Sequence, residues 1–413
     1  MARQPHPQGN VFPIWFGLLR RNLNTGVIYA DLANVLIALR RDPDMCDALA
    51  FDEMLQDSIL MKAIPLAPGS RPGESPPKRV SDDDVSRVQE WLQHNSLPRV
   101  GREIVGQAVE HRARETRFHP IREALSALNW DGVGRLNTWL KDYMEAEGSL
   151  SYLAAIGSMF LISMVARVFR PGCKCDYMLV LEGEQGAQKS QACAVLAGDY
   201  FSDDLGDIST KDAKQHVRGK WLVEESELAN FNRATTESLK SFLTRTHEKY
   251  RPPYAKAQVE EPRQCVLVGT TNKSDWNKDD TGARRFWPVK VGRIDIVGLK
   301  RVRDQIFAEA VSRFQNGEPW WPEPEFEAQV IKPEQETRRA VDPWEHPIFQ
   351  WLLGRVSEKT TVMEVAQGAL LMDKSRVGTA DANRIKSAMS LAGWRKDPNR
   401  TNRGFYWVYV PRV

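Results

Sequence analysis

The chain has 413 residues, a formal net charge of +3 and 42% hydrophobic residues. This composition is that of a globular protein long enough for two or three domains, and the small net charge does not by itself indicate nucleic-acid binding. Five dispersed cysteines argue against a disulfide framework and for a reducing compartment.

Residues 1–80 are expected to form a small helical unit with a Pro/Gln/Gly-rich tail. Leu32, Val35 and Leu39 recur at helical spacing. The Pro/Gly/Ser-rich stretch 65–79 that follows is typical of an exposed linker or loop.

Residues 81–176 are predicted to form a second, helical domain. Ser81 and the three aspartates after it are typical of a helix start. Further along, Leu150–Phe169 is apolar enough and long enough to span a membrane. Serines, Gly157 and Arg167 interrupt this stretch, so we expect a buried helix and no membrane partner.

Residues 178–190 (MLVLEGEQGAQKS) predict a strand, a phosphate-binding loop and the start of a helix. In such a loop, backbone N–H groups bind phosphate, Lys189 reaches the β- and γ-phosphates, and Ser190 ligates Mg²⁺. The candidate nucleotide-binding residues are Gly183, Glu184, Gln185, Gly186, Ala187, Gln188, Lys189 and Ser190.

Gln188 departs from the G-x-x-x-x-G-K-[ST] pattern, because it stands where the second glycine belongs. A left-handed conformation at a non-glycine residue costs about 1–2 kcal/mol. The alternative to a nucleotide site is therefore an ordinary Gly-rich turn between a strand and a helix.

A second short apolar run, Lys220–Val223, ends in a cluster of carboxylates. A strand that delivers carboxylates beside a phosphate loop supplies what Mg²⁺ binding and water activation need. The candidates are Glu224, with Ser190, for the metal, and Glu225 or Glu227 for the attacking water.

Two further features follow along the chain. The predicted strand Cys265–Val268 leads to the amide of Asn272, and a loop then ends in Arg284 and Arg285. Paired arginines can neutralise charge that develops on a γ-phosphate, often across a subunit boundary. Each feature is common alone, but their order and spacing indicate a phosphoryl-transfer ATPase.

These residues resemble the virulence-associated E family of phage and prophage proteins, over roughly residues 20–325. The resemblance rests on Phe118-His119-Pro120, Trp130-Asp131-Gly132, Pro171–Asp176, Leu239–Phe242, Tyr250–Tyr254, Gly269–Asn272 and Gly282–Pro288. It implies an α/β P-loop NTPase fold, AAA+-like, with a superfamily 3 helicase core at residues 177–325.

The resemblance also implies roles for single residues. It places Lys189 and Ser190 at the end of the Walker A motif and Glu224 and Glu227 at the Walker B position. It makes Asn272 the sensor residue and Arg284 or Arg285 the arginine finger. Where this family has an aspartate, the chain has His247-Glu248, and Glu248 is taken as its equivalent.

Residues 240–261 lie between the acidic strand and the strand that precedes Asn272. In superfamily 3 helicases this interval carries a hairpin that contacts single-stranded DNA in a central channel, where cations follow phosphates and rings stack on bases. Lys249, Arg251 and Lys256 are the candidate contacts. The alternative is a surface loop with ordinary lysine and arginine content.

Residues 345–413 predict a winged helix. Helices are expected at His346–Leu353, Thr361–Leu371 and Ala380–Ala392, followed by a two-stranded ribbon. The candidate contacts to duplex or fork DNA are Arg384, Lys386, Arg400 and Arg403. The alternative is a winged helix that packs only against protein.

The sequence thus predicts an ATP- and Mg²⁺-dependent DNA helicase or translocase of phage or prophage replication. We expect it to act on single-stranded or fork DNA in the cytoplasm of a bacterial host, as a ring, most simply a hexamer. A primase or initiator would lie on another chain. The alternative is a nucleotide-switched DNA-binding initiator, regulatory or defence protein that separates no strands.

Overall fold

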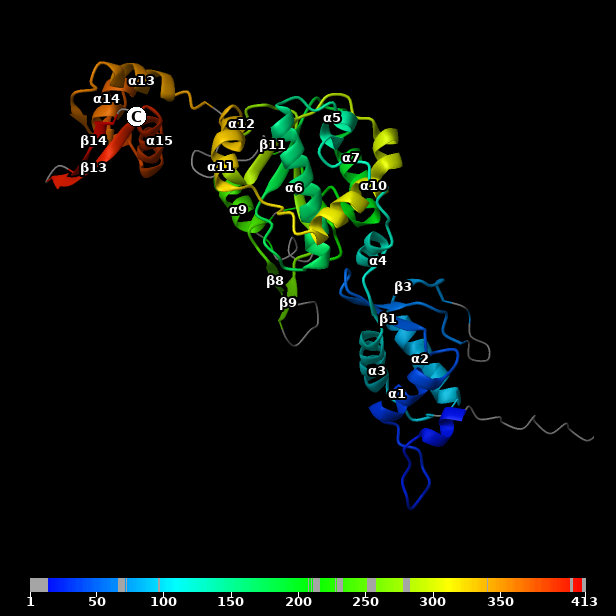
Figure 1. Ribbon diagram of the computed structural model, residues 1–413. Helices are drawn as coiled ribbons and strands as arrows, with labels where there is room; N and C mark the ends of the chain where they lie inside the picture. Colours follow the sequence, from blue (N-terminus) through cyan, green and yellow to red (C-terminus); the bar gives the residue numbers. More distant parts are fainter. Residues whose placement is uncertain are drawn as a thin grey trace, which may run out of the picture.

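The computed structural model describes most of the chain as three units joined in sequence (Figure 1). Outside the description are residues 1–13, 66–70, 72, 96, 207, 209, 211–215, 227, 229–232, 251–257, 278–282, 340, 402–403 and 411–413, with the side chains of 233, 234, 283, 399–401, 404 and 405. The predicted DNA contacts Arg251, Lys256 and Arg403, the side chain of Arg400, and the predicted water-activating Glu227 therefore lie outside the described residues.

The N-terminal unit combines helices with a four-stranded sheet. Its elements are η1 (Ile14–Leu18), α1 (Leu32–Arg41), β1 (Leu49–Asp52), β2 (Asp57–Leu60), β3 (Lys78–Arg79), α2 (Asp82–Asn95), α3 (Arg102–Glu115) and β4 (Arg117–Phe118), with the sheet order β3-β2-β1-β4. Asp31 caps α1 by accepting a hydrogen bond from the backbone N–H of Asn34 at 3.0 Å. Such a cap satisfies one of the free donors at the helix start.

The division between the first two units differs from the predicted one at residues 80 and 81. Helices α2 and α3 share one hydrophobic core with α1 and the sheet, through Val35, Phe51, Leu92 and Val109 among others. The strands of this sheet have two to four residues, too few for an alternating pattern to stand out. The sequence therefore predicted two helical parts where the structure has one mixed unit.

The central unit is built around a five-stranded parallel sheet in the order β11-β5-β10-β7-β6. Its strands are β5 (Met178–Glu182), β6 (Phe201–Ser202), β7 (Leu222–Glu225), β10 (Val266–Thr271) and β11 (Phe286–Lys290). The helices and turns of the unit are α4 (Pro120–Ser126), α5 (Trp139–Met144), α6 (Leu150–Phe169), α7 (Lys189–Ala197), η2 (Gly198–Tyr200), α9 (Arg233–Leu243), η4 (Ala283–Arg285), α10 (Ile296–Gln315), α11 (Pro324–Phe326), η5 (Glu327–Ile331) and α12 (Lys332–Glu336).

Alternate residues of the buried strands face two different helix layers. Leu179 and Leu181 share a core with α6, α7 and α10, whereas Met178 and Val180 share one with α9. The near-continuous apolar composition of these strands follows, because both faces of a parallel sheet are covered. The structure thus has the mixed α/β class with a parallel sheet.

Helix α6 is the one described helix with the length and hydropathy of a membrane span, and 83% of its apolar window is buried inside the protein. Arg167 near its end is 1% exposed. Its guanidinium donates to the backbone carbonyls of Arg245 and Arg263 at 3.4 and 3.3 Å. The prediction of a buried core helix is confirmed.

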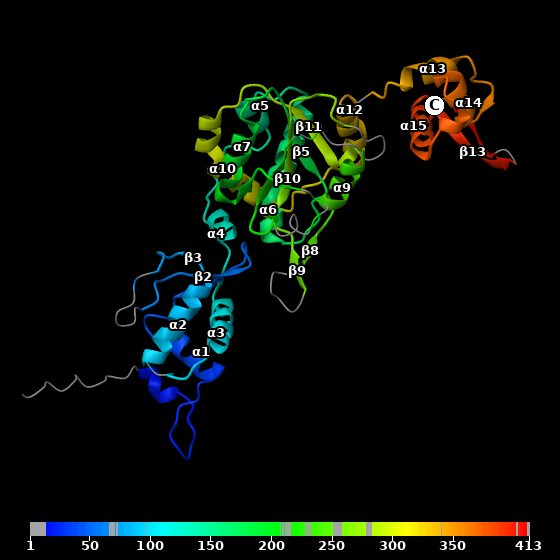
Figure 2. The same ribbon diagram turned by 180° about the vertical axis from the view of Figure 1, so that it is seen from behind.

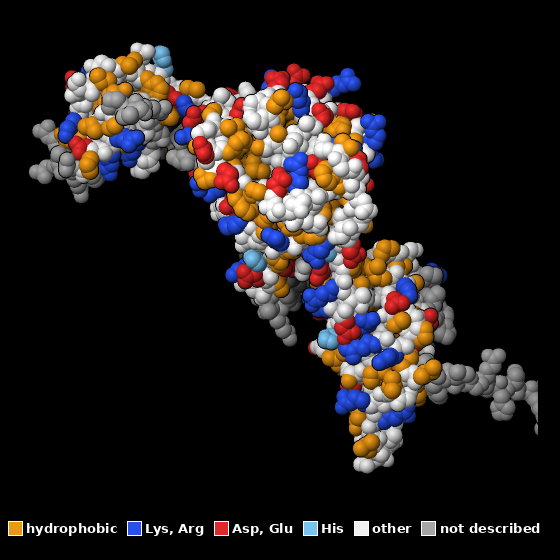
Figure 3. Space-filling view, in the orientation of Figure 1, with side chains coloured by type: hydrophobic (Ala, Val, Ile, Leu, Met, Phe, Trp, Pro, Cys, Tyr) orange, Lys and Arg blue, Asp and Glu red, His pale blue; other side chains and the backbone are white. Residues whose placement is uncertain are grey.

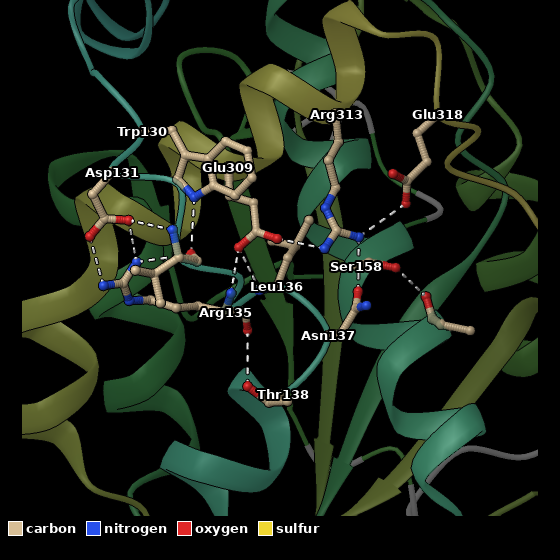
Figure 4. A network of polar contacts seen from close by, with 12 residues as sticks. Trp130, Asp131, Arg135, Leu136, Asn137, Thr138, Ser158, Glu309, Arg313 and Glu318 are labelled. Atoms are coloured by element: carbon tan, nitrogen blue, oxygen red, sulfur yellow. Dashed lines mark hydrogen bonds and ion pairs between the residues drawn. The ribbon is translucent and has the colours of Figure 1, made fainter.

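The Trp130-Asp131-Gly132 segment forms part of a polar network that ties the loop before α5 to α10 (Figure 4). The fully buried Glu309 accepts hydrogen bonds from the backbone N–H groups of Arg135 and Leu136 at 2.6 and 2.9 Å, and pairs with Arg313. Hydrogen bonds from the Arg135 guanidinium lower the pKa of Asp131 to about 2. In the structure, this segment therefore has a scaffolding role.

The turn between β1 and β2 docks the N-terminal unit on the central one. Met54 is buried in the central core, and the backbone carbonyl of Glu53 accepts a hydrogen bond from Gln264 at 2.7 Å. Gly219 has φ +71, and a Cβ there would lie 2.6 Å from a methyl of Leu55. Only glycine therefore suits this close approach.

The antiparallel hairpin of β8 (His247–Tyr250) and β9 (Val259–Pro262) projects from the central unit toward the side of the N-terminal unit (Figures 1 and 2). Its base precedes β10, so it lies at the amino edge of the parallel sheet. The buried guanidinium of Arg263 pairs there with the buried carboxylate of Glu248. Glu248, the predicted equivalent of a family aspartate, thus anchors the hairpin.

The C-terminal unit has the three helices that the sequence predicts, each within two residues, and one additional strand. Its elements are α13 (Glu345–Leu353), β12 (Lys359–Thr360), α14 (Val362–Leu370), η6 (Lys374–Arg376), α15 (Thr379–Leu391), β13 (Trp394–Thr401) and β14 (Gly404–Tyr409). The sheet order is β12-β14-β13, and a separate core contains Ile348, Val365, Ile385 and Trp394.

Candidate functional site

The carboxyl edge of the parallel sheet gathers the predicted nucleotide-binding residues. The loop predicted to bind phosphate, residues 183–190 and called the phosphate-binding loop below, follows β5. The acidic pair ends β7, and β10 lies between these two strands. Loops at the carboxyl ends of parallel strands are the usual place for ligands in α/β sheets. They enclose a cavity of about 530 Å³, lined by Gln185, Gly186, Ala187, Gln188, Lys189, Ser190, Gln191, Glu224, Ser226, Thr270, Thr271, Asn272 and Lys273.

The phosphate-binding loop contains two residues with left-handed backbone. Gly186 has φ +86, and Gln188 has φ 63 and ψ 27 directly before α7 begins at Lys189. The predicted left-handed conformation at Gln188 is thus present, and a side chain stands where the general pattern has glycine. The N-terminus of α7 faces the cavity, where its free N–H groups can bind an anion.

Lys189 is folded back over its own loop. Its Nζ donates to the backbone carbonyls of Gly183 and Glu184 at 2.8 and 2.9 Å. Burial lowers the pKa of Lys189, and the nearby charge of Glu224 partly opposes this shift. A phosphate entering the loop would compete with the two carbonyls for this ammonium group.

Glu224 connects the loop to the strands. It is 1% exposed, and its Oε1 accepts hydrogen bonds from the hydroxyls of Ser190, at 2.8 Å, and Thr270. Its Oε2 is buried and has no hydrogen-bond partner among the described residues. A buried carboxylate oxygen without a partner is unfavourable unless a ligand or water satisfies it.

This arrangement fits a hydrated Mg²⁺ that has phosphate oxygens as further ligands. Glu224 Oε2, which has no hydrogen-bond partner in the part of the chain that the structure describes, and the Ser190 hydroxyl lie together beside the loop. Both are oxygen donors, the type that Mg²⁺ prefers. Among the described residues, no group of three or more His, Cys, Asp or Glu could hold a metal alone.

Glu225 is not brought into the cavity. Successive side chains of a strand point to opposite faces, so Glu225 faces away from the loop that Glu224 contacts. Burial raises the pKa of Glu225 to about 7, with smaller contributions from the charges of Asp204 and Glu224. Its carboxyl group is thus partly protonated near neutral pH, on the far side of β7.

Asn272 lines the cavity directly after β10, as predicted. The neighbouring Lys273, which the sequence analysis did not select, lines it too. Thr270 was also missed, although its hydroxyl contacts Glu224. The signal for both lay in their position, because Thr270 lies two residues before Asn272 and Lys273 directly follows it at the same strand end.

Arg284 and Arg285 lie at the opposite edge of the sheet. They precede β11, which pairs with β5 in parallel from Phe286↔Met178 to Lys290↔Glu182. Four residue steps of a strand span about 13 Å, and this length separates the arginines from the phosphate-binding loop. They are not brought together with the loop of their own chain.

The candidate DNA-binding side chains that are described already have partners. Lys249 on the hairpin pairs across the strands with Glu260 at 3.1 Å, and both are exposed. In the C-terminal unit, Arg384 pairs with Asp342 and lies 3.8 Å from the ring centre of Trp344. This contact weighs against base reading by Arg384.

Lys386 is exposed on α15, with its ammonium group 3.2 Å from Asn383 Oδ1. On the face of the central unit shown in Figure 3, the described acidic and basic side chains are interspersed. That face therefore carries no continuous basic track.

Comparison with solved structures finds weak similarities. One structure of the apo C-terminal region of NrS-1 is 12% identical, covering 93% of this chain and 100% of that one, with a TM-score of 0.41. A second structure of this region is 10% identical, covering 88% and 96%, also with a TM-score of 0.41. No curated protein sequence matches the chain.

The family comparison is more specific. The model of the virulence-associated protein E-like domain matches residues 125–340, slightly more than half of the chain. The matched segment begins in α4 and ends in the linker that precedes α13. It therefore contains the whole parallel sheet and the cavity at its carboxyl edge. The family resemblance seen in the sequence is confirmed over residues 125–340, whereas residues 20–124 of the expected span lie outside the match. The chain belongs to the virulence-associated protein E-like family.

Proposed function

We propose that the chain is a P-loop ATPase of the superfamily 3 type that moves along DNA during replication. The contact of Ser190 and Thr270 with Glu224 is the observation that carries the proposal. It joins the phosphate-binding loop to the ends of β7 and β10 and leaves one buried carboxylate oxygen free among the described residues. Mg²⁺ bound to a triphosphate would satisfy that oxygen.

In this proposal, the chain's own groups divide the work of ATP hydrolysis. Backbone N–H groups of residues 183–190 and the Lys189 ammonium hold the triphosphate, while Ser190 and Glu224 place Mg²⁺, which supplies charge neutralisation when bound. Asn272 orients the attacking water. Glu227 is preferred over Glu225 as the group that polarises the water, because Glu225 faces the other side of β7.

The position of Arg284 and Arg285 supports a ring. About one strand length separates them from their own phosphate-binding loop, so a finger role requires the loop of a neighbouring protomer. The hairpin lies at the same amino edge as these arginines, where the centre of a ring, most simply a hexamer, could present it to single-stranded DNA.

The C-terminal unit has the helix and strand order of a winged helix. In the proposal, the C-terminal unit contacts fork DNA through Lys386 and through Arg400 and Arg403 of the ribbon. A primase or initiator would act from another chain.

A nucleotide-dependent switch is the second candidate. The left-handed Gln188 and the Lys189 ammonium held by two carbonyls describe a loop that has to rearrange before it holds phosphate. A slow loop of this kind would suit an initiator, regulatory or defence protein that assembles on DNA with ATP and seldom hydrolyses it.

ATP hydrolysis by the purified chain, with and without single-stranded DNA, tests the proposal. We expect Mg²⁺-dependent hydrolysis that DNA stimulates and that Lys189→Ala abolishes. We expect Glu224→Gln to keep the hydrogen bonds at Oε1 but to weaken the response to Mg²⁺ by about 10- to 100-fold. Nucleotide binding without hydrolysis would favour the switch, and absence of nucleotide binding would contradict both candidates.

A further inference from the structure

The carboxylate of Glu182 joins three segments directly before the phosphate-binding loop. Glu182 ends β5 and is 3% exposed. Its Oε1 accepts a hydrogen bond from Trp276 Nε1 at 2.7 Å, and Arg338 Nε lies 3.3 and 3.1 Å from its two oxygens. Trp276 belongs to the loop that follows Asn272, and Arg338 belongs to the segment that follows α12.

Glu182 is buried, and Arg338, with which it forms an ion pair, is half-buried. Burial raises the pKa of Glu182, against the opposing effect of Trp276 and Arg338. Burial would lower the pKa of Arg338, but Glu182 and Glu334 outweigh it, so the pKa of Arg338 is raised. Removing one member of such a pair leaves the other charge buried without compensation.

The segment that carries Arg338 is also fixed by backbone contacts. The carbonyl of Arg338 accepts a hydrogen bond from the backbone N–H of Asn277 at 3.1 Å, and Asn277 and Arg339 form a parallel bridge. Gln335 Nε2 donates to the carbonyl of Phe286 in β11 at 2.7 Å. The segment thus lies between the loop after Asn272 and the edge strand of the sheet.

The next residue, Arg339, binds the C-terminal unit. It pairs with the buried Glu345, the first residue of α13, with Arg339 Nη2 and Glu345 Oε2 2.7 Å apart. Asp342 follows and pairs with Arg384 of α15, with Nη2 and Oδ1 2.8 Å apart. Two consecutive arginines therefore connect the end of β5 on one side and the C-terminal helices on the other.

We propose that Arg338 and Glu182 are positioning residues that couple nucleotide binding in the phosphate-binding loop to the C-terminal unit. The inference rests on the proposed function. A bound phosphate would draw Lys189 away from the carbonyls of Gly183 and Glu184, and these residues follow Glu182 without any spacer. A shift of that backbone changes the contact with Arg338 and thereby the segment that leads to α13. Such coupling is reciprocal, so DNA bound to the C-terminal unit would change nucleotide affinity by the same factor.

Hydrogen exchange of the full chain tests this coupling, with a non-hydrolysable ATP analogue and Mg²⁺ as the probe. In the wild-type chain we expect the analogue to change amide exchange in the phosphate-binding loop and in residues 341–353. In Arg338→Gln we expect the change in the loop to persist and the change in 341–353 to be lost. Arg338→Lys, which keeps the charge, should restore part of it.

Arg313→Gln is the matched control, because Arg313 also pairs with a buried glutamate, Glu309, but on the side of α10 that faces the loop before α5. Arg313→Gln should keep the change in amide exchange on nucleotide binding both in the phosphate-binding loop and in residues 341–353. Thermal unfolding shows whether Arg338→Gln is folded. If it is not, Arg339→Gln removes the ion pair with Glu345 and leaves the pair of Arg338 with Glu182 intact. The same loss in 341–353 is then expected.

DNA affinity supplies the second readout. For the wild-type chain we expect the analogue to change the affinity for fork DNA, the ligand proposed for the C-terminal unit, by about 5-fold or more. For Arg338→Gln we expect the analogue to leave this affinity unchanged. Equal responses of wild type and Arg338→Gln, with analogue bound to both, would overturn the coupling alone. Failure of the wild-type chain to bind the analogue, seen as an unchanged loop, would overturn the proposed function and the coupling together.

Discussion

Gln188 is held at a positive φ in the turn that leads into α7, where a side chain is strained. The strain of about 1–2 kcal/mol exceeds the extra chain entropy of glycine, about 0.5–1 kcal/mol. We therefore expect Gln188→Gly to raise the free energy of unfolding by about 0.5–1 kcal/mol and to tighten nucleotide binding. Urea unfolding and nucleotide titration measure the two effects. The control is Gln185→Gly in the same loop, where φ is not positive and glycine should destabilise; a loss of stability in both variants would contradict the strain argument.

At the scale of elements, the contact of α5 with α6 depends on Gly157. A Cβ there would lie 2.7 Å from the indole nitrogen of the fully buried Trp139 and 3.1 Å from Leu140. We expect Gly157→Ala to lower the free energy of unfolding by about 1–3 kcal/mol, because a packed core has no room for the methyl group. The matched control is Gly106→Ala in α3, whose Cβ would meet only Val85 at 3.8 Å. It should stabilise its helix by up to about 1 kcal/mol. Chemical denaturation measures the change in the free energy of unfolding for both variants. If both variants were destabilised, or both stabilised, packing at Gly157 would not be the cause of the difference.

At the scale of the whole molecule, the ring hypothesis predicts complementation between two inactive variants. Arg284→Ala or Arg285→Ala should bind nucleotide but lose turnover by about 10³-fold or more, since a finger in trans is worth that much. Lys189→Ala should lose nucleotide binding. Mixed rings would pair an intact loop from the arginine variant with an intact arginine from the Lys189 variant, so the mixture should recover part of the ATPase activity. Activity equal to the sum of the separate proteins would exclude action across a subunit boundary.

Local patterns in the sequence were sufficient for the strand, loop and helix around Lys189 and Ser190, for the buried character of α6 and for the helices of the C-terminal unit. These features depend on residues close together in the chain: apolar runs, glycine in a turn and periodicity along a helix. The identity of the family followed from the same short segments. The predicted ATPase activity, DNA binding and ring formation stay predictions.

Contacts between residues distant in the chain decided the order of the strands, the division into units and the neighbours of the site residues. Pairing of β10 between β5 and β7 brings Thr270 and Glu224 together, and no local pattern encodes which strands are neighbours. Tertiary packing also merged α2 and α3 with the first sheet. It placed Arg338 against Glu182, 156 residues away in the chain. Sequence periodicity reports which face of an element is apolar, whereas the partner of that face is chosen only when the whole core forms.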